Sequence, residues 1–145
     1  MAYAYFDTSA LITRYVNERG RREVLQLLRK NDCVISAVLP VEVRSALRRR
    51  VAEGTLDDAR IPAILQRFTA DRAFWTLIEV SREVLASAET LSAAHPLRAL
   101  DAIHVASAQM FATRIGSSTF TFVSADTRQT TAAGALGMTT RLIVS

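Results

Sequence analysis

Short apolar runs alternate along the chain with longer segments in which apolar residues recur every three or four positions. The short runs predict β-strands over five stretches: Ala2–Phe6, Cys33–Ser36, Thr76–Val80, Thr119–Ser124 and Arg141–Val144. The longer segments predict helices over seven stretches: Ser9–Val16, Arg21–Lys30, Pro40–Val51, Asp57–Asp71, Ser81–Leu91, Leu97–Thr113 and Thr127–Leu136.

Strands that alternate with helices through short links favour a mostly parallel sheet with helices on both faces. Pro40 suits the first turn of a helix, and Gly137 directly follows the last predicted helix and suits a left-handed C-terminal cap. A chain of 145 residues is typical of one core. We therefore predict a single α/β domain over residues 1–145, with a mostly parallel central sheet of about five strands. In such sheets, ligands bind beyond the carboxyl ends of the strands, at a topological switch point.

Four acidic residues fall at the ends of predicted strands or the starts of predicted helices, in otherwise apolar surroundings. Asp7 follows the first strand and Asp126 follows the fourth. Glu42 lies in the first turn of the helix after the second strand, at the edge of its apolar stripe. Asp101 lies near the start of a helix that is apolar nearly all round and is therefore predicted to be buried. A charge in the first turn of a buried helix needs a partner.

Each of these acids alone has a structural explanation. Asp7 and Asp126 suit N-caps, and Glu42 and Asp101 suit the positive end of a helix dipole. Four carboxylates at one strand-end crevice, however, would repel one another unless a cation neutralised them, so at least one should have a raised pKa in the absence of metal. A ligand set made only of oxygen atoms selects Mg²⁺ or Mn²⁺ over zinc.

The charge balance is compatible with an anionic partner. The chain carries 18 Lys and Arg residues against 14 Asp and Glu, for a net charge of +4, and all of the basic residues except Lys30 are arginine. The planar guanidinium suits phosphate groups. We predict that the segment Arg44–Arg50 faces the crevice or its rim, with Arg48 and Arg49 as candidates for contacts to a nucleic-acid backbone. The alternative is that this run is a solvated helix face.

Other features carry less information about chemistry. His104 follows Asp101 by about one helical turn, and on a buried helix a hydrogen-bonded core histidine is the favoured interpretation. Cys33, the single cysteine, is predicted to be a buried, unreactive strand residue. No apolar run approaches the roughly 18 residues of a membrane span, and the N-terminus lacks the features of a signal peptide. We expect a cytoplasmic protein with no membrane partner.

Four stretches together form a family pattern: "YFDTSAL", "SAVLPVEVRSAL", "LRALDAIHVASA" and "FVSADTRQTTAAGALGM". They span nearly the whole chain, and the third is the most specific. In this order they resemble the PIN-domain ribonucleases, and among them the VapC-like toxins of type II toxin–antitoxin pairs. The resemblance implies a metal-dependent endoribonuclease that acts as a toxin, a cognate antitoxin protein as partner, and a homodimer.

The resemblance also implies a catalytic metal site with a hydroxyl neighbour: Asp7, Glu42, Asp101 and Asp126, with Ser9. The implied cofactor is Mg²⁺ or Mn²⁺, which would activate water and leave 5′-phosphate and 3′-hydroxyl ends. Asp7, Asp101 and Glu42 would hold the first ion, and Asp126, shared with Asp7, would hold or orient a second.

Two questions stay open under this interpretation: the number of bound metal ions and whether the domain is catalytically active. Some PIN nucleases carry a further acid shortly after the fourth, whereas Thr127 and Arg128 follow here, so the number of bound metals is not fixed. The rival function is a catalytically silent PIN scaffold that binds RNA, although such domains lose acids and all four are present here. An aspartyl-phosphate phosphatase is disfavoured, because its signature requires a second Asp where this chain has Ser9.

Overall fold

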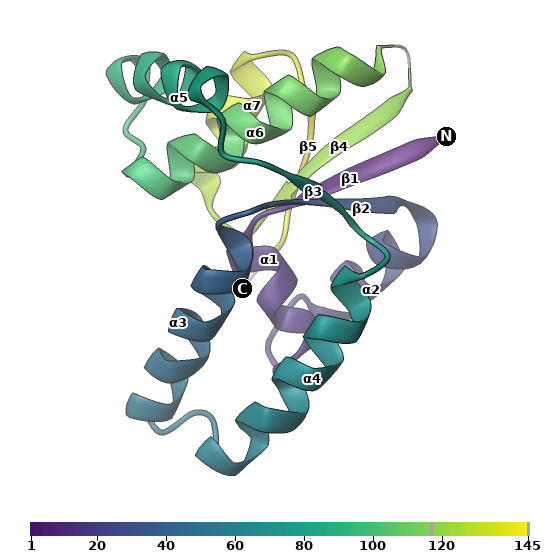
Figure 1. Cartoon of the computed structure of the whole chain (residues 1–145), viewed down its shortest axis with the longest axis vertical. Helices are drawn as coiled ribbons and strands as arrows, with labels where there is room; N and C mark the ends of the chain where they lie inside the picture. Colours follow the sequence, from purple (N-terminus) through teal and green to yellow (C-terminus); the bar gives the residue numbers. More distant parts are fainter. Residues whose placement is uncertain (117, 145) are drawn as a thin grey trace.

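A parallel β-sheet runs through the middle of the molecule, and helices cover both of its faces (Figure 1). The structure is a computed structural model that describes residues 1–116 and 118–144. The strands in this part of the chain are β1 (Ala2–Phe6), β2 (Asp32–Ser36), β3 (Thr76–Ile78), β4 (Thr119–Ser124) and β5 (Thr139–Leu142). The α-helices are α1 (Thr8–Leu11), α2 (Arg21–Lys30), α3 (Leu39–Ala52), α4 (Ile61–Arg72), α5 (Arg82–Ala94), α6 (Ala99–Ile115) and α7 (Thr127–Ala135), and the 3₁₀ turns are η1 (Ile12–Arg14) and η2 (Asp58–Arg60).

The strand order places the first strand at the centre of the sheet. The order is β3-β2-β1-β4-β5, and each neighbouring pair is parallel. The chain moves outward from β1 to β2 and β3, and then crosses to the other side of β1 for β4 and β5. The topological switch point therefore lies between β1 and β4, where a ligand is expected at the carboxyl ends of the strands. The predicted α/β fold is confirmed.

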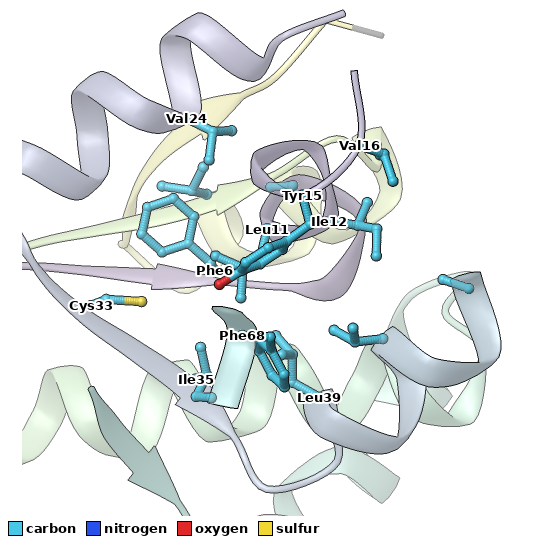
Figure 2. Close-up of a cluster of buried hydrophobic side chains, with 14 of the residues drawn as sticks. Phe6, Leu11, Ile12, Tyr15, Val16, Val24, Cys33, Ile35, Leu39 and Phe68 are labelled. Carbon is cyan, nitrogen blue, oxygen red and sulfur yellow. The ribbon is translucent and has the colours of Figure 1, made fainter. Parts of the chain in front are cut away.

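Successive residues of the central strands face two separate apolar cores, because side chains of a strand alternate between the two faces of a sheet. In β1, Ala4 and Phe6 pack against the helices α1 to α4, whereas Tyr5 packs against α5, α6 and α7. Figure 2 shows the first core, in which the following side chains meet around β1 and β2: Phe6, Leu11, Ile12, Tyr15, Val24, Ile35, Leu39 and Phe68. Burial on both faces fixes β1 up to its last residue, so the next residue, Asp7, lies at the rim of the core.

The structure corrects four predicted elements. The helix predicted over Asp57–Asp71 is the 3₁₀ turn η2, with Asp57 as its N-cap, followed by α4. The helix predicted over Ser9–Val16 is one α-helical turn, α1, followed by the 3₁₀ turn η1, and the Thr13 hydroxyl donates to the Ala10 carbonyl at 2.8 Å where the turn tightens. The last strand spans Thr139–Leu142 rather than Arg141–Val144, because its pairing with β4 begins at Thr139. The strand predicted over Thr76–Val80 ends at Ile78.

The helix start marked by Pro40 and the helix end marked by Gly137 are found where the sequence placed them, to within one residue. Pro40 is the second residue of α3. Gly137 follows the end of α7 with φ +90°, its N–H donates to the Gly134 carbonyl at 3.0 Å, and the Met138 N–H donates to the Ala133 carbonyl at 3.1 Å. This pair of bonds is a Schellman motif, which needs the left-handed conformation that glycine supplies.

Cys33 lies buried in β2, and burial raises the pKa of its thiol, as expected for an unreactive core residue. Among the described helices, none combines the length and the apolar character required to cross a membrane.

Candidate functional site

A cleft of 820 Å³ is lined by all four acids that the sequence singled out, Asp7, Glu42, Asp101 and Asp126. Asp7 follows β1 and N-caps α1, and Asp126 follows β4 and N-caps α7. Glu42 lies in the first turn of α3, the helix after β2, and Asp101 lies in the first turn of α6. The cleft therefore opens at the carboxyl ends of the strands around the switch point. Four segments far apart in the sequence are brought together there, as the pattern predicted.

Asp7 is a buried carboxylate held only by neutral donors. Its side chain is 1 % exposed. The Ser9 hydroxyl lies 2.8 Å from both carboxylate oxygens, the Ser124 hydroxyl donates to Oδ2 at 2.8 Å, and the Ala10 N–H donates to Oδ1 at 3.1 Å. Burial raises the pKa of Asp7, and the nearby His104 ring and these hydrogen bonds oppose the rise only in part. The expectation of a raised pKa is met at Asp7, with burial rather than like-charge repulsion as the cause.

Glu42 is half-buried and is held by two side chains from other elements. The Thr8 hydroxyl donates to Oε1 at 2.8 Å, and His104 Nε2 lies 2.5 Å from the same oxygen. Burial alone would raise the pKa of Glu42, but the His104 and Thr8 hydrogen bonds and the nearby Arg49 charge bring it below its usual range. Their surroundings thus raise the pKa of Asp7 and lower the pKa of Glu42.

His104 is a core histidine with both ring nitrogens bonded, as favoured from the sequence. It is 1 % exposed, and its Nδ1 lies 2.7 Å from the Tyr5 hydroxyl. The assignment that satisfies both contacts has the Tyr5 O–H donating to Nδ1 and the Nε2–H donating to Glu42. Tyr5 is itself stacked on Phe122, with ring centroids 5.5 Å apart. A chain of contacts therefore runs from the core through His104 to the cleft and fixes Glu42.

Asp101 and Asp126 are bonded to the first turn of α7. Arg128 Nη2 lies 3.3 Å from Asp126 Oδ2 and 3.9 Å from Asp101 Oδ2. Gln129 Nε2 donates to Asp101 Oδ1 at 2.9 Å, and the Arg98 N–H donates to Asp101 Oδ2 at 3.3 Å. Gln129 is buried, and its Oε1 has no hydrogen-bond partner in the described part of the chain. Asp126 is therefore an N-cap, as its structural explanation expected, and Asp101 lies in the positive first turn of α6, and both also line the cleft.

The arginine segment of α3 faces the cleft only in part. Arg49 and Arg50 line the cleft, whereas Arg44 and Arg48 do not. Arg48 instead pairs with Asp58 at 2.7 Å. Arg49 lies about two helical turns after Glu42 and so shares its face, whereas Arg48 is turned away by about 100°. The expectation that the segment faces the crevice or its rim is met at the lining by Arg49 and Arg50, and Arg44 and Arg48 lie outside that lining.

The four acids have the donor chemistry of a divalent-cation site, since all their ligand atoms are carboxylate oxygens. Asp7 has no cationic partner within salt-bridge distance among the described residues, which leaves a buried charge for a metal ion to neutralise. As the described side chains stand, no three Asp, Glu, His or Cys residues are close enough to hold one ion. The acids therefore fit a metal by identity and placement, and some of their side chains must turn from protein partners to bind it.

Sequence reasoning implied Ser9 beside the acids and favoured a hydrogen-bonded His104, but it missed the other residues that hold the acids and the bond between His104 and Glu42. Thr8 follows Asp7 directly, and His104 shares a helix face with Asp101 at three residues' spacing, so local signals existed for both. Tyr5, Ser124 and Gln129 reach their partners only through the fold.

The sequence model of the PIN domain matches residues 4–135. The chain belongs to the PIN-domain family. PIN domains are generally nucleases and typically use a divalent metal. No curated protein sequence matches this PIN domain.

Several solved structures share the fold of this PIN domain over most of both chains. A toxin–antitoxin complex from Klebsiella pneumoniae is 22% identical, with 87% of this chain and 88% of that chain covered and a TM-score of 0.61. FitAcB from Neisseria gonorrhoeae is 14% identical, with 94% and 95% covered and a TM-score of 0.69. VapBC2 from Rickettsia felis, bound to a DNA fragment from their promoter, is 12% identical, with 98% and 99% covered and a TM-score of 0.63. At these identities the likeness establishes the common fold.

Proposed function

We propose that this PIN domain is a metal-dependent endoribonuclease that acts as the toxin of a type II toxin–antitoxin pair. The observation that carries the proposal is the convergence of four carboxylates, from four separate segments, on one cleft at the switch point of the sheet. Arginines on the rim of the same cleft suit a polyanionic substrate. Membership of a family of nucleases supports the same reaction class.

The proposed cofactor is Mg²⁺ or Mn²⁺. Asp7, Glu42 and Asp101 would hold the first ion, and Asp126, together with Asp7, a second. Bound ions of this kind polarise the scissile phosphoryl group and lower the pKa of a coordinated water. The unpartnered Oε1 of Gln129 supports a hydrated ion next to Asp101, because a bound water would supply the missing donor.

The protein's own residues orient these acids. Ser9 and Ser124 fix the Asp7 carboxylate, and Ser9 is the proposed supporting hydroxyl. Thr8 and His104 both bond to Oε1 of Glu42, which leaves Oε2 without a protein donor in the described part of the chain. None of the residues in the set is a strong nucleophile toward a phosphodiester, so the proposed reaction is attack by water, with 5′-phosphate and 3′-hydroxyl ends.

We propose Arg49 rather than Arg48 as the contact to the substrate backbone, because Arg49 lines the cleft whereas Arg48 pairs with Asp58. Arg49→Gln is expected to weaken RNA binding about three- to tenfold and to reduce the slope of log affinity against log salt by about one, because one phosphate contact is lost. Arg48→Gln is the matched control, since it removes the same charge from the same helix outside the cleft. Binding measured by fluorescence anisotropy at several salt concentrations distinguishes them. Equal losses for both variants would mean that only the general charge of α3 matters.

An antitoxin protein is the proposed partner, as in the toxin–antitoxin complex from Klebsiella pneumoniae. Val41 and Leu100, which are 71% and 44% exposed, add apolar surface to the lining of the acidic cleft. Such a rim supports a protein partner that covers the cleft. A homodimer and a cytoplasmic location are parts of the same proposal, and Phe74, 91% exposed just after α4, supplies apolar surface for association.

Expression in a bacterial host tests this function against the silent RNA-binding scaffold. Induction of the wild type should arrest growth and create new 5′-phosphate RNA ends at a limited set of sites, and Asp7→Asn should do neither. Sequencing of RNA 5′ ends before and after induction measures this. Growth arrest by both proteins without new ends would favour the silent scaffold.

A further inference from the structure

One cation of the protein already touches the candidate metal ligands. Arg128 Nη2 contacts Asp126 Oδ2 at 3.3 Å and approaches Asp101 Oδ2 at 3.9 Å, and its Nε lies 3.3 Å from Asp126 Oδ1. The other arginines that line the cleft, Arg49, Arg50 and Arg98, form no ion pair with the four acids in the described part of the chain; Arg50, for example, pairs with Glu18. Among the arginines that line the described cleft, Arg128 therefore differs in pairing with the candidate metal ligands.

The position of Arg128 is not explained by the stability of its helix. Asp126 is the N-cap of α7, so Arg128 is the second residue of the helix. A positive side chain is unfavourable at the N-terminal end of a helix, where the dipole is positive and the free N–H groups seek anions. The two carboxylates are the feature that favours a cation at this point. The Asp126 hydrogen bond in turn holds the Arg128 guanidinium in its charged form, with a raised pKa.

We propose that the Arg128 guanidinium is a built-in counter-cation of the Asp101–Asp126 pair and competes directly with the divalent cation for these two carboxylates. The inference rests on the proposed function, because it assumes that the acids hold a metal ion. A single guanidinium neutralises one of the two charges, whereas a divalent ion neutralises both. Asp7, which has no cationic partner among the described residues, is the part of the site that favours the metal from the start.

Arg128 is placed to be displaced rather than to block the site permanently. Its side chain is 44% exposed, so it can turn from the cleft into solvent. Exposed ion pairs contribute a modest net free energy, so a divalent ion can displace Arg128 at a cost of about tenfold or less in affinity. In the metal-free protein, Arg128 keeps two neighbouring carboxylates from repelling each other. In the metal-bound protein it must leave Asp101, and its departure raises the metal concentration that the site requires.

The test is Mn²⁺ binding to the purified full-length protein, measured by isothermal calorimetry and by loss of the free-ion signal in electron paramagnetic resonance. Arg128→Gln should tighten Mn²⁺ binding about tenfold, the scale expected when a unit charge beside the site is removed and solvent screening is taken into account. Arg98→Gln is the matched control, because Arg98 also lines the cleft and carries the same charge. It should change the affinity less than about threefold. Arg128→Lys keeps the charge without the planar fork and should lie between wild type and Arg128→Gln.

The outcomes separate this inference from the proposed function. If the wild type binds Mn²⁺ and Arg128→Gln binds it no more tightly than Arg98→Gln does, Arg128 does not compete with the metal ion. The proposed metal site would be unaffected by that result. Wild type and both glutamine variants that bind no Mn²⁺ would overturn the metal site itself, and the competition with it. Thermal unfolding in EDTA shows that each variant is folded, and Arg128→Lys gives a second reading should Arg128→Gln fail to fold.

Discussion

Asp7→Asn is expected to lower the rate of RNA cleavage by about 10²–10³-fold, the range found when one preorganised group that stabilises a transition state is removed from an active site. The variant keeps the shape of the side chain, and the hydroxyls of Ser9 and Ser124 can rotate to accept from the new amide. It removes a fully buried charge that only neutral donors hold. The metal-free variant should therefore be at least as stable as the metal-free wild type, as measured by thermal unfolding in EDTA.

The pH dependence of this difference has a defined sign. Burial raises the pKa of Asp7 in the folded state, so the folded protein binds a proton that the unfolded chain has lost. The free energy of unfolding of the wild type should fall as pH rises from the ordinary Asp pKa, about 3.9, through the raised value. Asp7→Asn has no carboxyl group at this position and does not lose stability in this way. In EDTA, its free energy of unfolding relative to wild type should therefore increase with pH over that window.

Asp71→Asn is the control for this experiment. Asp71 is also partly desolvated, but hydrogen bonds from Arg14 and Tyr15 and the Arg14 charge bring its pKa below the usual range. Its contribution to stability is present above the ordinary Asp pKa and is lost as pH falls, the opposite sign to Asp7. Asp71→Asn should therefore be less stable than wild type at neutral pH. An Asp7→Asn variant that melts well below wild type in EDTA would show that the Asp7 charge is structural.

His104→Leu is expected to lower RNA cleavage about 10–100-fold, the usual effect of removing a group that orients a metal ligand. The substitution takes away the donor to Glu42 Oε1 while it fills the buried space of the ring. Thr8 alone would then hold Glu42. The Mg²⁺ concentration for half-maximal cleavage should rise, which separates an effect on the metal ligand from a general loss of folded protein. His104→Gln keeps a donor and should lose less activity.

The matched control for His104→Leu is His95→Leu, at the other histidine of the chain. His95 is half-buried at the end of α5, outside the lining of the cleft, so the substitution should leave the Mg²⁺ dependence unchanged. If His104→Leu cleaves RNA with wild-type rate and Mg²⁺ dependence, then Glu42 does not depend on His104 for its role.

The hydrophobic pattern predicted the elements best where local residues decide the structure. The bounds of β1, α2 and β4 coincide with the predicted Ala2–Phe6, Arg21–Lys30 and Thr119–Ser124. The hydrophobic pattern was less accurate where contacts with other residues determine the bounds of an element. The register of β5 follows from its pairing with β4, and η1 follows from a side-chain bond of Thr13. Neither contact leaves a periodic trace in the sequence.

The candidate site shows the same division. Asp7, Glu42, Asp101 and Asp126 were found because strand ends of a parallel sheet meet at one edge, a rule that needs no coordinates. Helix geometry alone favours Arg49 over Arg48, since Arg49 lies on the face of Glu42. The Arg128 contact to Asp101 depends on how α7 packs beside α6, which sequence spacing does not encode, whereas the Arg128 contact to Asp126 is local. Asp101, which bonds to Arg98, Gln129 and Arg128, proved less suitable than Asp7 for separating function from stability.

The most direct test of the metal-dependent nuclease is cleavage of a defined single-stranded RNA by the purified wild-type protein in Mg²⁺, in Mn²⁺ and in EDTA, with the product ends mapped. We expect cleavage with either metal, none in EDTA, recovery when Mg²⁺ is restored, and products with 5′-phosphate and 3′-hydroxyl ends. Asp7→Asn, assayed in parallel, should stay inactive in Mg²⁺. Cleavage by the wild type at the same rate in EDTA as in Mg²⁺ would contradict the account, because the four carboxylates would then act without an ion.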